Sequence, residues 1–263
     1  MSLLPSLTVF LTKKRNPLLF ILTTISVQER FFIIPAAYNL FLKEGISMKE
    51  FRLVAFGDSL TYGYGVLSHV AFPSRLAKEL PKKSPLPWKI YNRGINGDTT
   101  REARQRLDSH VLRLKPQIVT LLLGSNDSAL NEGQYRTPWE YEQNMAFILE
   151  QLLACRHGES AFHGGFCLPL LLTPPPVVDT DFYPFTTTDR IELYRDIVCK
   201  LATAYDCPVI DLYTAFLSVK ETKGFEAYDA LFQFDGVHWS NAGYALCYEL
   251  LEQTLLDLTR HIK

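Results

Sequence analysis

Features that would place this 263-residue chain outside the ordinary globular proteins are scarce. Five cysteines are too few for a disulfide scaffold, and 14 glycines exclude a collagen-like repeat. The 27 Lys and Arg residues are balanced by 28 Asp and Glu residues, so the basic excess of a protein that binds nucleic acid or anionic membranes is missing. With 47% hydrophobic residues, the chain is too apolar for intrinsic disorder. These absences favour a globular protein with one core, or at most two.

Nucleotide-binding and common hydrolase signatures are also missing. No Walker motif follows the first predicted strand, and no GxGxxG fingerprint does so either. The GxSxG elbow of the α/β-hydrolases is absent as well. No apolar run reaches the ~20 residues that span a bilayer. We therefore expect no cofactor, no nucleic-acid partner and no stable membrane insertion, while the sequence leaves the oligomeric state open.

Residues 1–47 form a leader that differs from the rest of the chain, with five basic residues against two acidic residues and two apolar runs. Basic residues before the apolar stretch 17–27 resemble a signal peptide, but no small-x-small cleavage site follows. A membrane anchor or an amphipathic surface segment is a second interpretation, although the apolar residues show no helical stripe. We favour a third, in which translation starts at Met48, because Met48 leads straight into the first predicted strand.

From residue 50 onward, short apolar runs alternate with longer segments that have helical spacing. Continuously apolar strands between helices are typical of parallel strands that are buried on both faces. The sequence thus predicts one α/β domain over residues 48–263, with three α/β/α layers around about five parallel strands. Right-handed crossovers place the loops after the strands at one edge, where ligands bind. The predicted strands are 52–56, 89–92, 117–123, 166–172 and 208–212, and the predicted helices are 73–80 (ended by Pro81), 100–115, 138–152, 189–204 and 241–258.

Four short polar segments carry candidate chemistry, and three of them follow a predicted strand. Small and polar residues at strand ends let backbone N–H groups approach a substrate closely. The four segments are Gly57-Asp58-Ser59-Leu60-Thr61, Gly94-Ile95-Asn96-Gly97-Asp98-Thr99, Gly124-Ser125-Asn126-Asp127 and Asp235-Gly236-Val237-His238.

Ser59, His238 and Asp235 are the candidate catalytic residues. A serine hydroxyl is a poor nucleophile until a neighbouring base takes its proton, and His238 is the obvious base. Asp235 lies three residues before His238, and Gly236 allows a tight turn between them. A short loop can then aim both side chains the same way, so that the carboxylate orients the imidazole.

Over residues 50–258 the sequence resembles the SGNH hydrolases, also called GDSL esterases and lipases, because it carries all four of the family's signature blocks in order. The run Gly97-Asp98-Thr99-Thr100 is most similar to the bacterial branch of arylesterases, thioesterases and lysophospholipases. The resemblance implies a flavodoxin-like fold. It also implies an oxyanion hole formed by the backbone N–H groups of Ser59 and Gly97 and the side-chain amide of Asn126.

Each block also has a purely structural interpretation. Asp58 and Ser59 could cap a helix, and Asp235 could cap the last helix. Gly94 and Gly97 could serve only as turn residues, and Asn126 with Asp127 could form an Asx turn. The coincidence of a nucleophile, a base, an orienting acid and oxyanion donors favours catalysis. We interpret Asp58 and Asp127 as structural residues that accept backbone N–H bonds in their loops, and expect the same of Asp98 and Thr99.

Two cysteines and two histidines between residues 155 and 167 raise a zinc alternative, but their spacing matches no common zinc motif, so we expect no metal. The odd number of cysteines indicates reduced thiols in a cytoplasmic compartment, with export as the alternative if residues 1–47 act as a signal.

The sequence predicts a serine esterase whose partner is a small-molecule ester. Aryl, short or medium acyl esters are expected, and thioesters and lysophospholipids stay open. The alternatives are an O-acetyl carbohydrate esterase, an acyltransferase of the same fold, or a binding module without catalysis. Segments 172–185 and 128–135 are the expected walls of the substrate pocket. Trp239 either narrows the entrance or packs under its loop.

Overall fold

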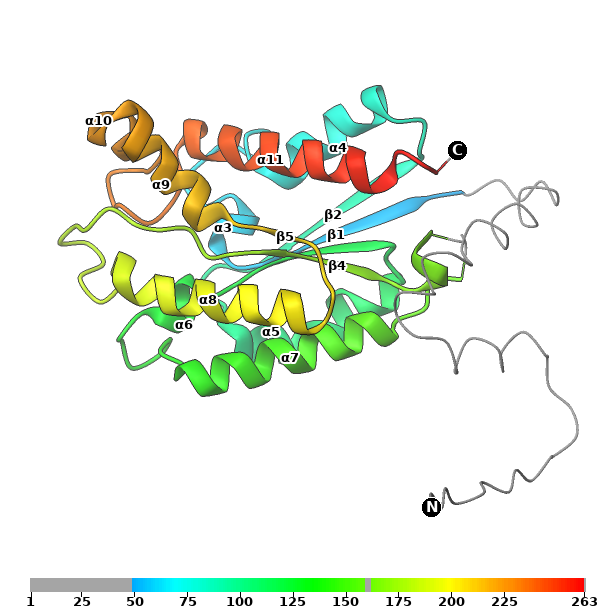
Figure 1. Ribbon diagram of the computed structural model, residues 1–263, viewed down its shortest axis with the longest axis horizontal. Helices are drawn as coiled ribbons and strands as arrows, with labels where there is room; N and C mark the ends of the chain where they lie inside the picture. The colour runs from blue at the N-terminus through cyan, green and yellow to red at the C-terminus, as the bar shows by residue number, and fades with distance from the viewer. Residues whose placement is uncertain (1–48, 159–161, 263) are drawn as a thin grey trace, which may run out of the picture. The chain divides into compact units, whose positions relative to one another are not determined.

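The computed structural model describes residues 49–158 and 162–262 (Figure 1). The leader predicted over residues 1–47 and the proposed start at Met48 lie outside the described residues. The boundary of the domain at residue 48 therefore stays a prediction.

A five-stranded sheet with the order β2-β1-β3-β4-β5 forms the middle layer, and each strand is parallel to its neighbours. This order is that of the flavodoxin-like folds, in which ligands bind at the carboxyl ends of the strands. The predicted three-layer fold is confirmed. The strands are β1 (Phe51–Gly57), β2 (Trp88–Gly94), β3 (Ile118–Leu122), β4 (Leu168–Leu172) and β5 (Val209–Ile210).

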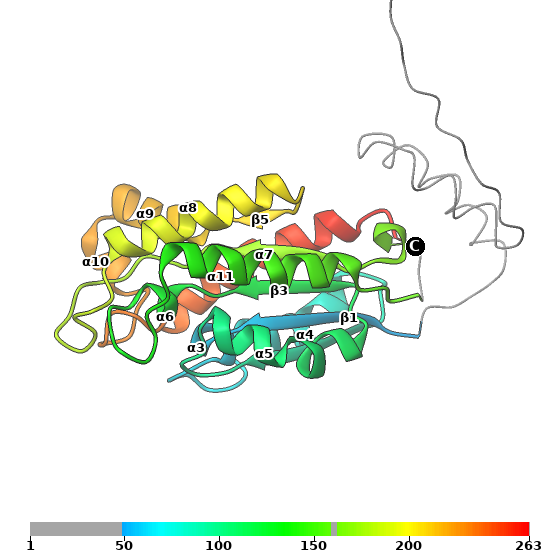
Figure 2. The ribbon, with the colours of Figure 1, turned by 90° about the horizontal axis from the view of Figure 1, so that it is seen from below.

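Helices cover both faces of the sheet (Figures 1 and 2). One face is covered by α4, α9 and α11, and the other by α5, α7 and α8. The helices are α3 (Ser59–Tyr62), α4 (Phe72–Lys83), α5 (Thr100–His110), α6 (Ser125–Ser128), α7 (Pro138–Ala154), α8 (Thr188–Ala204), α9 (Leu212–Lys223), α10 (Phe225–Asp229) and α11 (Asn241–Thr259), with short 3₁₀ turns at Leu112–Leu114 and Phe162–Gly165.

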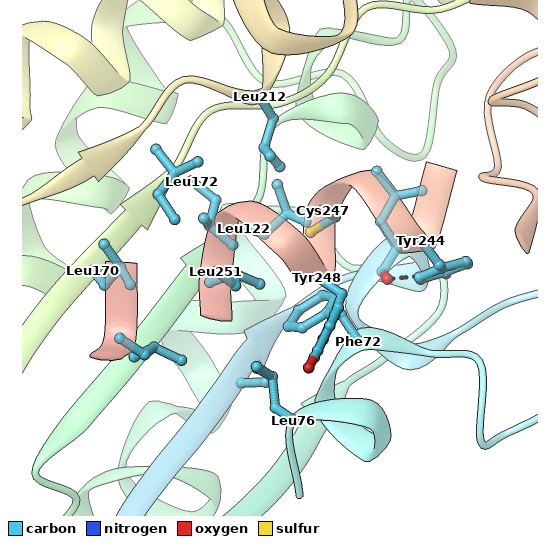
Figure 3. Close-up of a cluster of buried hydrophobic side chains, with 14 of the residues drawn as sticks. Phe72, Leu76, Leu122, Leu170, Leu172, Leu212, Tyr244, Cys247, Tyr248 and Leu251 are labelled. Atoms are coloured by element: carbon cyan, nitrogen blue, oxygen red, sulfur yellow. Dashed lines mark hydrogen bonds between the residues drawn. The ribbon is translucent and has the colours of Figure 1, made fainter. Parts of the chain in front are cut away.

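The alternation of side chains along β1 explains the two hydrophobic cores. Leu53 and Ala55 point into the core beneath α4 and α11, whereas Val54 and Phe56 point into the core beneath α5, α7 and α8. Successive residues of a strand face opposite sides, so a strand between two helical layers must be apolar at nearly every position. Figure 3 shows the first core, where leucines of β3 and β4 meet residues of α4 and α11.

Three boundaries differ clearly from the sequence prediction. Helix α5, predicted to extend to residue 115, ends at His110 and is followed by the 3₁₀ turn Leu112–Leu114. Helix α4 continues through Pro81 to Lys83: Pro81 has no N–H to donate, but the Ser84 N–H still bonds the Leu80 carbonyl at 3.0 Å and completes the last turn. Strand β5 has only two residues, and Leu212, predicted as strand, begins α9. The cause is Asp211, whose carboxylate accepts the Thr214 N–H at 3.2 Å and caps this helix. Helices α9 and α10 were not predicted, although Asp211 was a usable signal for α9.

Candidate active site

Ser59 lies where β1 passes directly into α3. The Asp58 side chain caps this helix by accepting the Leu60 N–H at 2.9 Å, which makes Ser59 the first helical residue. Gly57 permits the turn, because a Cβ there would lie 2.3 Å from the Leu122 carbonyl oxygen on β3. The Ser59 hydroxyl is therefore held at the carboxyl edge of the sheet by backbone packing as well as by the helix cap.

The loop before α11 brings His238 and Asp235 to that hydroxyl. His238 Nε2 lies 3.0 Å from Ser59 Oγ, and His238 Nδ1 lies 2.7 Å from Asp235 Oδ2. The other carboxylate oxygen, Asp235 Oδ1, accepts the backbone N–H groups of Val237 at 3.0 Å and His238 at 2.9 Å. All three predicted catalytic side chains are thus brought together and are buried. Asp235 both orients the imidazole and shapes the loop that carries it.

The segment between β4 and α8 supports this loop from outside. Val178 donates its N–H to the Gly236 carbonyl at 2.9 Å, and the Thr180 hydroxyl donates to the Asp235 carbonyl at 2.7 Å. Gly236 has a φ of +75°, and a Cβ there would lie 2.0 Å from the Val178 carbonyl oxygen. Only glycine fits this position without displacing the segment. The proline-rich segment predicted as a pocket wall therefore also positions Asp235 and His238.

The three predicted oxyanion donors come from neighbouring loops. In the described ranges, neither the Ser59 N–H nor the Gly97 N–H donates to another residue. The Asn126 amide donates one N–H to the Asp98 carbonyl at 2.9 Å, and its oxygen accepts from Gln134 Nε2 at 2.9 Å. These two contacts define the orientation of the amide and leave its second N–H available. Sequence reasoning did not single out Gln134, since a glutamine eight residues downstream of Asn126 carries no local signal.

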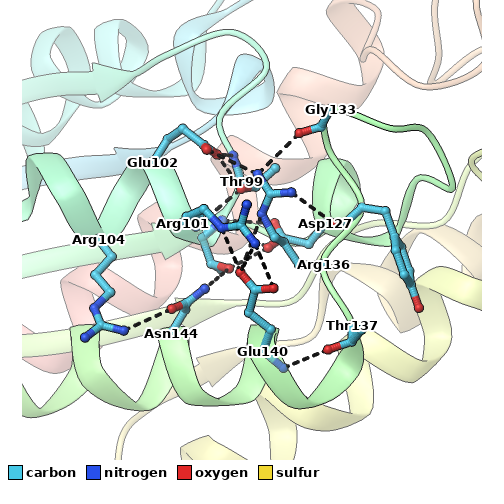
Figure 4. A network of polar contacts seen from close by, with 12 residues as sticks. Thr99, Arg101, Glu102, Arg104, Asp127, Gly133, Arg136, Thr137, Glu140 and Asn144 are labelled. Atoms are coloured by element: carbon cyan, nitrogen blue, oxygen red, sulfur yellow. Dashed lines mark hydrogen bonds and ion pairs between the residues drawn. The ribbon is translucent and has the colours of Figure 1, made fainter.

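A polar network behind these loops fixes their positions (Figure 4). The Asp127 carboxylate accepts the Thr100 N–H at 3.0 Å and also the Thr100 hydroxyl. Thr99 caps α5 in a capping box with Glu102, and Arg136 bonds Glu102 at 3.2 Å. The loops after β2 and β3 are consequently tied to the same helix start.

The acidic residues of these loops behave differently from one another. Asp58 and Asp127 accept backbone N–H groups as predicted, whereas the Asp98 carboxylate pairs with the Arg106 guanidinium at 2.5 Å. Arg106 also donates to the Gly57 carbonyl at 2.9 Å, which joins the loop after β2 to β1. Burial raises the pKa of both Asp58 and Asp127 to about 7. The pKa of Asp127 is raised despite the opposing Thr100 hydrogen bonds.

A groove of about 680 Å³ opens beside Asp235. Tyr64 and Gly65 form one wall, Phe182 and Tyr183 form another, and Gln233 and Phe234 complete it. The ring centroid of Tyr64 lies 4.3 Å from that of His238, so the groove reaches the candidate base. Segment 172–185 lines the groove as predicted. Segment 128–135 does not line this groove; it turns Gln134 towards Asn126, beside the predicted oxyanion donors, so its role as a second wall stays a prediction.

Trp239 packs under its loop and does not narrow the entrance. Its side chain is fully buried, with its ring centroid 5.3 Å from those of Phe216 and Tyr244. The cysteines and histidines of the zinc alternative make other contacts: His157 Nε2 lies 3.1 Å from the Phe162 carbonyl oxygen, and the Cys155 thiol faces the Leu112 carbonyl. Within residues 49–158 and 162–262, no group of three potential metal ligands is close enough to hold an ion.

Comparisons with known proteins agree on one family. A sequence profile described as the GDSL-like lipase/acylhydrolase family matches residues 55–246, which include every residue of the candidate site. Thioesterase 1/protease 1/lysophospholipase L1 of Escherichia coli K12 is 31% identical over 210 residues, covering 80% of this chain and 85% of that protein. The uncharacterized lipoprotein YqeF of Bacillus subtilis is 28% identical over 237 residues, covering 80% and 92%. The crystal structure of a lipase/acylhydrolase from Enterococcus faecalis is 27% identical, has a TM-score of 0.62, and covers 78% and 94%.

Proposed function

Because the chain belongs to the GDSL-like lipase/acylhydrolase family, a family of esterases, we propose that it hydrolyses carboxylic esters with Ser59 as nucleophile, His238 as general base and Asp235 as the residue that orients the base. One observation carries this proposal. The imidazole of His238 lies between the Ser59 hydroxyl at 3.0 Å and the Asp235 carboxylate at 2.7 Å. Both distances allow hydrogen bonds, and the order of groups is that of a serine hydrolase triad.

Hydrolysis proceeds in two steps: acylation of Ser59 and hydrolysis of the acyl-enzyme. His238 Nε2 takes the Ser59 proton as Oγ attacks the ester carbonyl, and the resulting imidazolium then gives this proton to the leaving alcohol. A water molecule attacks the acyl-enzyme after losing a proton to His238, which returns it to Ser59 Oγ as the carboxylic acid departs. Asp235 Oδ2 accepts the Nδ1–H throughout and stabilises the imidazolium.

The negative charge on the carbonyl oxygen exists only in the tetrahedral intermediates and nearby transition states. The Ser59 and Gly97 N–H groups and the second N–H of Asn126 are available for it, since none has a partner in the described part of the chain. Donors already oriented before the reaction stabilise this charge without reorganisation. We assign these three groups to the oxyanion hole.

The groove supports an uncharged acyl or aryl group as the substrate portion beside the triad. Its walls are the rings of Tyr64, Phe182, Tyr183 and Phe234, and no Lys or Arg lines it. Aryl esters and short-to-medium acyl esters suit such walls. The relative named as a thioesterase and lysophospholipase keeps thioesters and lysophospholipids among the candidates.

Labelling with a fluorophosphonate tests the nucleophile. We expect the folded protein to be labelled at Ser59 and the Ser59→Ala variant to remain unlabelled. Labelling of the variant would contradict the assignment of Ser59, and absence of labelling in the folded wild type would favour the binding module. Initial rates on p-nitrophenyl esters of increasing chain length, with acyl-CoA, lysophospholipid and acetylated sugars alongside, then define the substrate.

We further propose a cytoplasmic location, which the five unpaired cysteines support. Sequencing of the N-terminus of the protein from its native source, together with cell fractionation, tests both this location and the start at Met48. A mature chain found outside the cytoplasm would contradict the proposal.

A further inference from the structure

Large apolar side chains are exposed around the mouth of the candidate site. They come from five loops: 63–71 after α3, 95–99 after β2, 129–137 after α6, 173–187 after β4 and 230–240 before α11. Exposed fractions reach 70% at Leu67 and 77% at Phe234. Contiguous exposed apolar patches on a folded protein mark interaction surfaces. We use the name apolar ring for Leu67, Ile95, Leu130, Phe182, Phe185 and Phe234.

Direct contacts join the loops on one side of this ring. Leu130 donates its N–H to the Phe185 carbonyl at 3.0 Å, which ties the loop after α6 to the loop after β4. The rings of Phe182 and Phe234 meet edge to face at 5.0 Å between centroids, which ties the loop after β4 to the loop before α11. The exposed side chains on this side thus belong to one continuous surface.

Hydrogen bonds continue the ring around the other side. Gln233 donates to the Tyr64 carbonyl at 2.9 Å and joins the loop before α11 to the loop after α3. Asn92, three residues before Ile95, donates to the Tyr62 carbonyl at 3.1 Å and joins the end of β2 to α3. The bonds around the Asn126 amide connect the loops after β2 and α6 and complete the circuit. The five loops are therefore joined to one another at the carboxyl edge of the sheet, where the triad also lies.

The ring extends beyond the groove that a single small substrate would fill. Leu67, Ile95, Leu130 and Phe185 do not line that groove, so substrate bound there leaves them in water. Only an occupant broader than one ester molecule would cover them together with the groove. A flat apolar phase would cover them together, with the triad facing it.

The charges of the five loops restrict the kind of surface. Arg136 is the only Lys or Arg among their residues and it is buried, whereas Glu132, Asp179 and Asp181 are exposed. An anionic lipid surface attracts basic segments, so these acidic loops are repelled by it. An uncharged or zwitterionic lipid surface does not repel these loops, so the exposed apolar side chains can enter it.

We propose that the apolar ring docks the protein on the surface of an uncharged or zwitterionic lipid assembly, so that the triad receives its ester from that surface. Delivery of an ester from the lipid surface to the triad rests on the proposed esterase function, whereas binding to the lipid surface does not depend on it. Binding of this kind places side chains at the interface without a spanning segment. Among the described residues, no helix is long and apolar enough to cross a membrane.

Vesicle binding of the full-length chain tests the proposal. The Ser59→Ala protein is mixed with phosphatidylcholine vesicles, so that no lipid is hydrolysed, and bound protein is measured by flotation. The ring variant also carries Leu67→Ser and Leu130→Ser, and the matched control carries Leu193→Ser and Val209→Ser, which are exposed on α8 and β5. We expect the ring variant to bind roughly tenfold more weakly, because two leucines lose apolar contact, and the control to bind like the parent.

Two further measurements separate docking from catalysis and from folding. With Ser59 restored, the ring variant should hydrolyse monomeric p-nitrophenyl acetate at the parent rate but a vesicle-embedded ester more slowly, and its melting temperature should match that of the control. Adding phosphatidylglycerol at low salt should weaken binding.

The proposal is overturned if Ser59→Ala does not bind phosphatidylcholine, if both variants lose binding equally, if binding requires phosphatidylglycerol, or if the ring mediates a dimer that the ring variant abolishes. Failure of the esterase proposal would appear separately, as absent fluorophosphonate labelling with vesicle binding intact.

Discussion

The substitution Asp58→Asn tests whether the carboxyl group beside the nucleophile is as strongly perturbed as its surroundings indicate. Asp58 is 1% exposed. Its Oδ1 accepts the Leu60 N–H, and its Oδ2 has no hydrogen-bond partner among the described residues. Burial raises the pKa from the ordinary 3.8 to about 7, the Leu60 N–H opposes this, and the carboxylates of Asp127 and Asp98 raise it further.

The sign of the effect on stability follows from proton binding. Between about pH 4 and pH 7 the unfolded chain loses the Asp58 proton while the folded protein keeps it, so the folded state binds more protons. The free energy of unfolding therefore falls as pH rises through this interval. The full difference between the two pKa values corresponds to about 4 kcal/mol, of which about 2–3 kcal/mol falls between pH 5 and pH 8. The amide introduced by Asp58→Asn cannot ionise, so the variant loses this pH-dependent contribution.

Urea unfolding at pH 5, 6, 7 and 8, at constant ionic strength, measures the change. The stability of Asp58→Asn relative to the wild type should increase by about 2–3 kcal/mol from pH 5 to pH 8. The amide of the variant lacks a hydrogen-bond partner, which lowers the free energy of unfolding by the same amount at every pH. This shifts the stability curve of the variant as a whole and leaves its slope against pH, relative to that of the wild type, unchanged. Parallel pH profiles for the two proteins would refute the reasoning, because Asp58 would then ionise alike in both states.

Three further substitutions test the site. Asn126→Ala should lower kcat roughly 100- to 1,000-fold while the protein still folds, since one oxyanion donor is removed; the loss of the contacts with Asp98 and Gln134 should lower the melting temperature only slightly. A change confined to KM would contradict its assignment. Asp235→Asn should lower kcat by about 10³- to 10⁴-fold, because an amide no longer selects the imidazole tautomer that accepts the Ser59 proton; near-normal turnover would show that another group orients His238. Gly236→Ala places a Cβ 2.0 Å from the Val178 carbonyl oxygen at a φ of +75°, so it should lower both the melting temperature and kcat; thermal unfolding and activity indistinguishable from those of the wild type would show that the Val178 segment yields without consequence.

The local pattern of apolar and polar residues was sufficient to predict most of the fold. Apolar runs separated by amphipathic segments predict parallel strands between helical layers, and the chain forms such a sheet. The pattern failed at element boundaries, where neighbouring local signals compete. Pro81 lies inside the last turn of α4, and the predicted strand ending at Leu212 yields after two residues to a helix capped by Asp211. Helix-capping competes with strand extension there, and the apolar run alone does not reveal which one prevails.

The sequence by itself determined which residues could perform the chemistry. The motifs of Ser59, Asp235 and His238 offer a nucleophile, an orienting acid and a base, and the resemblance to the SGNH hydrolases adds Gly97 and Asn126 as oxyanion donors. Tertiary structure alone decided how those groups are oriented and what surrounds them. Three features depend on segments that are distant in the chain. They are the Gln134 contact that orients the Asn126 amide, the burial that raises the pKa of Asp58, and the exposed apolar side chains of the loops near the triad. Orientation, desolvation and surface continuity depend on which segments the fold places side by side, and periodicity along one segment does not contain that information.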